Sequence, residues 1–267
     1  MSRGLGDVYK RQMKVFYMDK KRIFITGGIA LAIIAVILIT SVLSRNQGTT
    51  AFATTGVKPI YRVDTKEKKV AISFDAAWGA DKTAGIMDIM DEHGVKGTFF
   101  LVGFWVDKYP DMVKSIAERG FEIGNHSANH PRMTQLSKEQ MVKELTQVNE
   151  KIKELTGSAP TVFRPPFGDY NDLVVNTVRE QNMHCIQWDV DSLDWKDLST
   201  QEILNRVNKS VQNGSILLFH NNSKYILDAL PLVLESLEKK GYEVVPVSEL
   251  IYSGDYTVDD QGIQHKS

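Results

Sequence analysis

The chain has 267 residues, of which 42% are hydrophobic and 24% are charged, the balance of an ordinary globular protein. Its 32 basic and 33 acidic residues leave a net charge of −1, which gives no support for nucleic-acid binding. The single cysteine, Cys185, excludes an internal disulfide and a cysteine-rich zinc module. Any bound metal must therefore be held by histidines and carboxylates.

The charge is unevenly distributed along the chain. The first 44 residues hold seven Lys or Arg and two Asp or Glu, and the remainder has a balance of −6. Residues 23–44 are uncharged and apolar, and a helix of this length spans a hydrocarbon core of about 30 Å. Three basic residues precede this run, so we expect a single-pass anchor in the cell membrane, with residues 1–22 in the cytoplasm and the rest outside.

The beginning of the chain leaves alternatives open. Ala51-Phe52-Ala53 has the small-x-small form that signal peptidase accepts, so secretion after cleavage near Ala53 is the alternative to a retained anchor. The apolar run is longer than the roughly 7–15 residues of a signal sequence, which favours the anchor. Residues 1–12 do not resemble a lead-in to an anchor, and Met13 and Met18 are candidate native starts.

Short β-type runs alternate with helical patterns after a linker and first strand at residues 45–65. The β-type runs cover residues 69–75, 97–103, 121–126, 161–166, 183–189, 215–220 and 242–247. Such alternation predicts parallel strands with helical crossovers. Seven strands are too few for an eightfold barrel, so we expect a distorted α/β barrel over residues 66–254, followed by a tail at 255–267. No glycine-rich phosphate loop is found, which argues against nucleotide binding.

The ends of several helices are marked in the sequence. Ser137-x-x-Gln140 and Ser199-x-x-Glu202 have the form of capping boxes, which predict helix starts. Glycines follow three helical runs and predict their ends. These glycines are Gly94, Gly120 and Gly241.

Five of the apolar runs end in side chains that can carry chemistry. They are Asp75, Asn125 with His126, Arg164, Asp189 to Asp191, and His220. The carboxyl ends of parallel strands form the active face of α/β folds. Their gathering at one edge of the sheet therefore favours an enzyme.

His126 and His130 have a spacing that lets two imidazoles reach one metal ion. Two surface histidines at this spacing are also common. The strand-like residues before His126 and the proline after His130 indicate a strand-to-helix loop, which favours metal binding. One further carboxylate would complete a three-ligand site with an open position.

The other candidates each have a structural alternative. Asp75 could cap a helix that begins near Asp81, and Arg164 could either fork onto a carboxylate or lie at the surface. His220 could be a core histidine, and Trp195 could line a sugar groove or fill the core.

Taken together, SFDAAWG, HSANH, RPPFG, DSLDW and ILLFH resemble, in order and spacing, the five motifs of the polysaccharide deacetylase family. This is carbohydrate esterase family four, with its NodB homology domain, and the resemblance covers residues 66–252. The AAWG form of the first motif and the anchor are similar to the PdaB branch of sporulation-associated deacetylases. The resemblance implies a NodB-type distorted (β/α) barrel and a hydrolase that removes N-acetyl groups from peptidoglycan or a related envelope glycan. It also implies a divalent metal, zinc in the first place and cobalt as an alternative.

The same resemblance implies a role for individual residues. Asp75 matches the general base, and Arg164 matches the arginine that orients it. His220 matches the general acid, with Asp191 as its carboxylate partner, and His126 and His130 match the metal ligands. The residues that match the substrate-binding set are Pro165, Phe167 (with its backbone N–H facing the oxyanion), Trp195 and Leu218.

One position departs from the family's first motif. The second of two consecutive aspartates, the third protein ligand of the metal, is Ala76 here, and Asp75, Asp81 or water would have to replace it. Two functions from different classes therefore stay open. One is a metal-dependent N-deacetylase, favoured by the catalytic set. The other is a catalytically weakened glycan-binding or structural factor of the spore envelope, favoured by Ala76.

Overall fold

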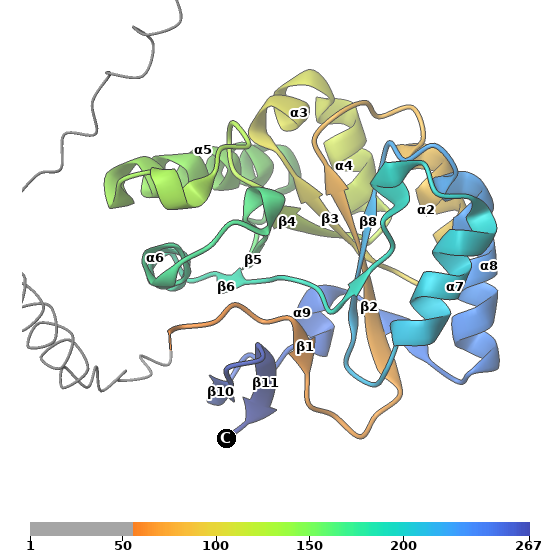
Figure 1. Cartoon of the computed structure of the whole chain (residues 1–267). Coiled ribbons are helices and arrows are strands. Elements are labelled where there is room, and N and C mark those ends of the chain that lie inside the picture. Colours follow the sequence, from red (N-terminus) through yellow and green to blue (C-terminus); the bar gives the residue numbers. More distant parts are fainter. Residues whose placement is uncertain (1–55) are drawn as a thin grey trace, which may run out of the picture. The chain divides into compact units, whose positions relative to one another are not determined.

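The computed structural model describes residues 56–267 (Figure 1). The anchor expected at residues 23–44 and the candidate cleavage site near Ala53 lie outside these residues and stay predictions. Within 56–267, no helix has both the length and the apolar character needed to cross a bilayer.

The centre of the fold is a sheet of eight parallel strands. Its strands follow the order β6-β5-β4-β3-β2-β8-β7, and β9 pairs with the start of β2. The strands are β2 (Lys69–Ala76), β3 (Thr98–Leu101), β4 (Glu122–Asn125), β5 (Val162–Phe163), β6 (His184–Cys185), β7 (Val190–Asp191), β8 (Ile216–His220) and β9 (Glu243–Val245). Each predicted run contains one of them, and only β7 was not expected. The predicted distorted barrel is confirmed.

Helices cover the outer face of this sheet (Figure 1). They are α2 (Thr83–Glu92), α3 (Gly103–Lys108), α4 (Pro110–Glu118), α5 (Lys138–Thr156), α6 (Asp172–Glu180), α7 (Thr200–Ser210) and α8 (Ile226–Lys239). The short helix α9 (Val247–Leu250) instead belongs to a second apolar cluster, with Ala71 and Phe100. Three short 3-10 helices lie in loops: η1 (Met133–Gln135), η2 (Pro166–Gly168) and η3 (Asp194–Lys196). Helix α8 packs against both α2 and α7. A continuous apolar core fills the space between helices and sheet, and in it the ring of Phe74 contacts those of Phe99 and Phe219.

The predicted helix boundaries are confirmed. Ser137 and Ser199 form capping boxes at the starts of α5 and α7, which satisfies backbone N–H groups that a helix start leaves free. The three predicted stop glycines follow α2, α4 and α8 with φ of 66°, 74° and 78°, a conformation that only glycine adopts without strain.

A second, three-stranded sheet joins the two ends of the described chain. Its strands are β1 (Arg62–Val63), β11 (Ile263–Lys266) and β10 (Tyr256–Val258), in that order. Ile60 pairs with Ile186 beyond β6, and Arg62 pairs with Ser215 before β8. The segment before β2 therefore spans the open edge between the two ends of the barrel. Residues 255–267, expected as a tail, supply two strands of this sheet.

Gly214→Ala is expected to destabilise the protein by roughly 3 kcal/mol or more, and Gly157→Ala by about 1 kcal/mol. Both glycines have positive φ, 76° and 82°. A Cβ at Gly214 would collide with the carbonyl oxygen of Val63, whereas one at Gly157 meets nothing within 4 Å. The pair therefore separates backbone strain from steric collision. Free energies from urea unfolding measure both effects, and equal losses would contradict the collision.

Candidate active site

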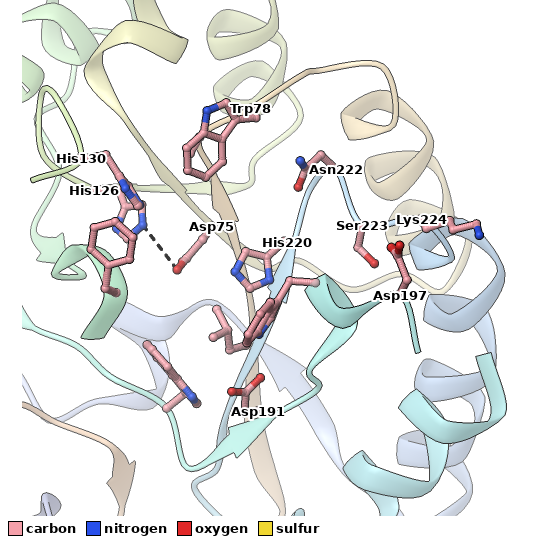
Figure 2. A pocket seen from close by; sticks show the side chains of 15 residues that line it. Asp75, Trp78, His126, His130, Asp191, Asp197, His220, Asn222, Ser223 and Lys224 are labelled. Carbon is pink, nitrogen blue, oxygen red and sulfur yellow. Dashed lines mark ion pairs between the residues drawn. The ribbon is translucent and has the colours of Figure 1, made fainter. Parts of the chain in front are cut away.

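The chemistry-bearing strand ends meet around one pocket of about 640 Å³ at the carboxyl edge of the sheet (Figure 2). The residues around it include Asp75, Trp78, His126, His130, Phe167, Asp191, Trp195, Asp197, Leu218, His220, Asn222 and Lys224. Strand pairing explains part of this gathering, because Asp75 on β2 lies in register with His220 on β8. Asp81 does not line the pocket.

Asp75 is held by a buried arginine. Arg164 is fully buried, and its Nη1 donates to Asp75 Oδ1 at 2.8 Å while Nη2 donates to the Gln187 carbonyl at 3.1 Å. The guanidinium also lies over the ring of Phe100, 4.1 Å from its centre. Arg164 is therefore a buried partner of a carboxylate and not a surface residue, but it contacts Asp75 through one nitrogen only and does not form the two-bond fork. Asp75 does not cap α2, whose N-cap is Lys82.

The charges around Asp75 keep it ionised. Burial alone would raise the pKa of Asp75, but the interactions with His126, Arg164 and His220, including the Arg164 hydrogen bond, outweigh burial and hold that pKa below its usual range. A carboxylate in this state can accept a proton from a water molecule in the pocket.

The two histidines of HSANH face each other in a loop. Their ring centres are 5.0 Å apart. The left-handed φ values of Ser127 (68°) and His130 (56°) turn this loop back on itself. His126 Nδ1 is 2.7 Å from the Arg164 carbonyl oxygen, which only accepts, so Nδ1 carries the hydrogen and Nε2 is free to bind a ligand. That nitrogen lies 3.5 Å from Asp75 Oδ2 (Figure 2).

The electrostatics of this histidine pair suit metal binding, but a third protein ligand is not provided. Burial lowers the pKa of His126, and burial together with His126 lowers the pKa of His130 to about 4, so both are neutral at pH 7, as metal ligands must be. Ala76 is fully buried in the apolar core and offers no donor. Among residues 56–267, no three His, Cys, Asp or Glu side chains are arranged to hold a metal. The two imidazoles fit a metal, and the third ligand position does not.

Without metal, the protein is expected to lose stability as the pH falls from about 6.5 towards about 4, and His130→Gln should reduce this loss. The unfolded chain protonates His130 near pH 6.5, whereas the folded protein does so only at about 4. The unfolded state therefore binds more protons in this window, which favours unfolding as the pH falls. Urea midpoints at several pH values, measured with a chelator present, test this. An identical pH dependence in both proteins would rule it out.

The partner of His220 is Asp194, so the prediction that Asp191 fills this role is wrong. His220 Nδ1 lies 2.8 Å from Asp194 Oδ1, and the His220 backbone N–H donates to Asp194 Oδ2 at 2.8 Å. Asp191 instead accepts from the Leu193 backbone N–H. Leu193 adopts a left-handed φ of 53°, and this turn carries Asp194 inward to 1% exposure and leaves Asp191 at the pocket wall.

His220 is tuned towards its protonated form. Burial alone would lower the pKa of His220, yet the hydrogen bond and charge of Asp194, together with the charges of Asp75 and Asp191, raise it above its usual value. A histidine with a raised pKa, oriented by a buried carboxylate, is suited to protonate a leaving group.

The rim of the pocket is aromatic. Phe167 and Trp195 are 59% and 56% exposed, so Trp195 does not fill the core, and Leu218 lines the floor from β8. Pro165 is buried and does not line the pocket, which contradicts its predicted contact with substrate. Sequence reasoning overlooked Trp78, although this residue is part of the quoted motif SFDAAWG.

Comparisons with known proteins agree with this geometry. Residues 62–186 match the family model described as polysaccharide deacetylase. The chain is 34% identical over 196 residues to a peptidoglycan-N-acetylglucosamine deacetylase of Bacillus cereus, covering 72% of this chain and 92% of that protein. It is also 34% identical over 194 residues to the uncharacterized protein YlxY of Bacillus subtilis, covering 73% of this chain but only 60% of YlxY.

Solved structures give the same result. BA3943 from Bacillus anthracis, described as a CE4 family pseudoenzyme, has a TM-score of 0.71 and 32% identity, covering 78% of this chain and 73% of that one. A BA3943 mutant described as having restored enzymatic activity has a TM-score of 0.70 and 36% identity, covering 72% and 70%.

Proposed function

Because the chain belongs to the polysaccharide deacetylase family, we propose that it hydrolyses the N-acetyl groups of an acetylated envelope glycan such as peptidoglycan. The observation that carries this proposal is the pairing of two opposed catalytic groups in one pocket. Asp75 and His220 lie in register on β2 and β8, and each is fixed by a buried partner of opposite charge. A surface that only binds sugar has no need of such a set. The AAWG motif and the expected anchor support action outside the cell membrane, during spore formation.

The residues of the chain divide the reaction between them. A divalent metal, zinc in the first place or cobalt, would be held by His126 and His130 and would supply Lewis-acid polarisation. Asp75 takes a proton from the attacking water while the oxygen of that water adds to the carbonyl carbon of the acetamide. The backbone N–H of Phe167 is the candidate donor to the developing oxyanion. His220 then protonates the sugar nitrogen as the C–N bond breaks, which releases acetate and a free amine.

Acetate release from N-acetylglucosamine oligomers and from peptidoglycan fragments tests the proposal. A protein that begins at residue 46 retains all of the described residues, 56–267. We expect release with zinc or cobalt and none after Asp75→Asn or His220→Ala. Release that survives both substitutions would eliminate the mechanism. Fragments that present only acetylated glucosamine or only acetylated muramic acid would identify the target sugar.

A second candidate function is glycan binding without turnover, as a weakened or structural factor of the spore envelope. Ala76 at the third ligand position favours it, and two similar structures are described as those of a pseudoenzyme. Metal content and acetate release of the wild type beside Ala76→Asp discriminate the two functions. A wild type that binds oligomers but releases no acetate with any metal supports the second function.

A further inference from the structure

Trp78 presents a large aromatic surface to the pocket. It lies in the loop after β2 and is 58% exposed. The described residues include seven large hydrophobic side chains that are exposed, and three aromatic ones, Trp78, Phe167 and Trp195, line this single pocket. Isolated exposed apolar side chains are ordinary, but their concentration around one pocket marks a binding surface.

Hydrogen bonds to the backbone of Gly79 fix the loop that carries Trp78. The carbonyl oxygen of Gly79 accepts from Trp105 Nε1 at 2.6 Å and from Asn221 Nδ2 at 2.8 Å. The same Asn221 amide donates to Thr83 Oγ1 at 3.1 Å. Trp105 and Asn221 are both buried, so two fixed donors from separate elements hold one carbonyl next to the indole. Trp78 is therefore exposed on a rigid support, which reduces the entropy lost when a ligand binds it.

Trp78 extends the aromatic rim on the histidine side of the pocket. The ring centre of Trp78 lies 5.3 Å from that of His130. The ring centre of Phe167 lies 4.6 Å from that of His130, so both aromatic rings contact this histidine. Figure 2 shows Trp78 on the side of His130, with Asp191 on the opposite side of the pocket. Trp195 and Leu218 supply apolar surface near His220. The pocket thus has aromatic surface beyond what one acetamido sugar at Asp75 and His220 would cover.

We propose that Trp78 is a specificity-determining residue that packs against the sugar ring next to the acetylated one. Pyranose rings present faces of C–H groups, which pack on an indole with little loss of polar hydration. Trp105 and Asn221 act as positioning residues, because they hold the Gly79 carbonyl. The pocket would therefore select a glycan chain over a single sugar. This inference rests on the proposed function for its ligand class, but it concerns binding and does not require turnover.

Calorimetric binding of the full-length protein to N-acetylglucosamine and to its pentamer, with zinc present, tests the inference. Trp78→Ala is expected to weaken pentamer binding about tenfold, the usual effect of losing an aromatic anchor. Binding of the monosaccharide should change less than about twofold, and Trp78→Phe should restore most of the pentamer affinity. Phe104→Ala is the matched control, because Phe104 is an exposed aromatic side chain outside this pocket and its loss should change neither affinity.

Asn221→Ala tests the positioning role. It should weaken pentamer binding and leave monosaccharide binding unchanged, a split that a general loss of structure would not give. If acetate is released, Trp78→Ala should raise KM for the pentamer and leave kcat unchanged.

The outcomes separate this inference from the proposed function. Absence of acetate release with the expected binding split would refute turnover and support the inference. Acetate release with unchanged pentamer binding in Trp78→Ala would overturn the inference and leave the proposed function intact. An equal loss for pentamer and monosaccharide, or a wild type that binds no pentamer, would also overturn it.

Discussion

Asp194→Asn is expected to lower the rate of acetate release at least about a hundredfold, the usual contribution of a positioned general acid. Asp194 orients His220 through two hydrogen bonds at 2.8 Å, one to the ring and one to the backbone N–H. The amide keeps the shape of the side chain but removes the charge that raises the pKa of His220. The catalytic acid would then be misoriented, and its pKa would be lower than in the wild type.

The pH dependence of acetate release shows whether Asp194→Asn lowers the pKa of His220. A general acid works in its protonated form, so activity falls as the pH rises through the pKa of His220. Loss of the Asp194 charge lowers that pKa, and the alkaline decline should therefore begin at a lower pH in Asp194→Asn. Asp191→Asn is the matched control, because Asp191 lies three positions away in the same turn and bonds only to a backbone N–H. A larger loss in Asp191→Asn than in Asp194→Asn would refute the assignment.

Arg164→Met is expected to destabilise the protein by about 3–5 kcal/mol, because it leaves the Asp75 carboxylate buried without its partner. Arg164 is fully buried, and Asp75 is only 8% exposed, so water on the pocket side of Asp75 replaces only a small part of the lost interaction. For a domain of this size the loss corresponds to a fall in Tm on the order of 10 °C. Thermal unfolding followed by circular dichroism measures it.

A double substitution separates the lost pair from lost packing. Asp75→Asn combined with Arg164→Met removes both charges and should recover part of the stability lost in Arg164→Met alone. An additive or larger loss in the double variant would show that the guanidinium acts mainly through its contacts with Phe100 and Gln187.

The sequence predicted the barrel well because each buried strand leaves a local signature. A run such as residues 69–75 is apolar on both faces, as a parallel strand covered by helices must be. The chemistry at strand ends was also predictable, since parallel strands align their carboxyl ends. The pairing of β1 with β11 was not, because two short strands far apart in the sequence carry no local sign of their partnership.

The choice between Asp191 and Asp194 could not be made from the sequence. Both are carboxylates in DSLDW, three positions apart, and the turn that selects one depends on the left-handed conformation of Leu193. Leucine rarely adopts that conformation, so a leucine at position 193 does not predict the turn. Residue type alone also left the exposure of Trp195 open, because a large apolar residue is expected inside unless a ligand surface requires it. Only the family resemblance placed Trp195 in the substrate-binding set.

The pairing of β1 with β11 also sets the order in which the domain can be completed. Arg62 pairs with Ile263 and Val63 with Gln264. The strand at residues 62–63 therefore pairs with residues that are translated about two hundred positions later. In a nascent chain β2, β3 and β4 can pair early, but the second sheet cannot form until β11, with Gln264, has been translated. Shortening the chain before residue 263 would therefore loosen the barrel at an edge that is encoded near the other end of the domain.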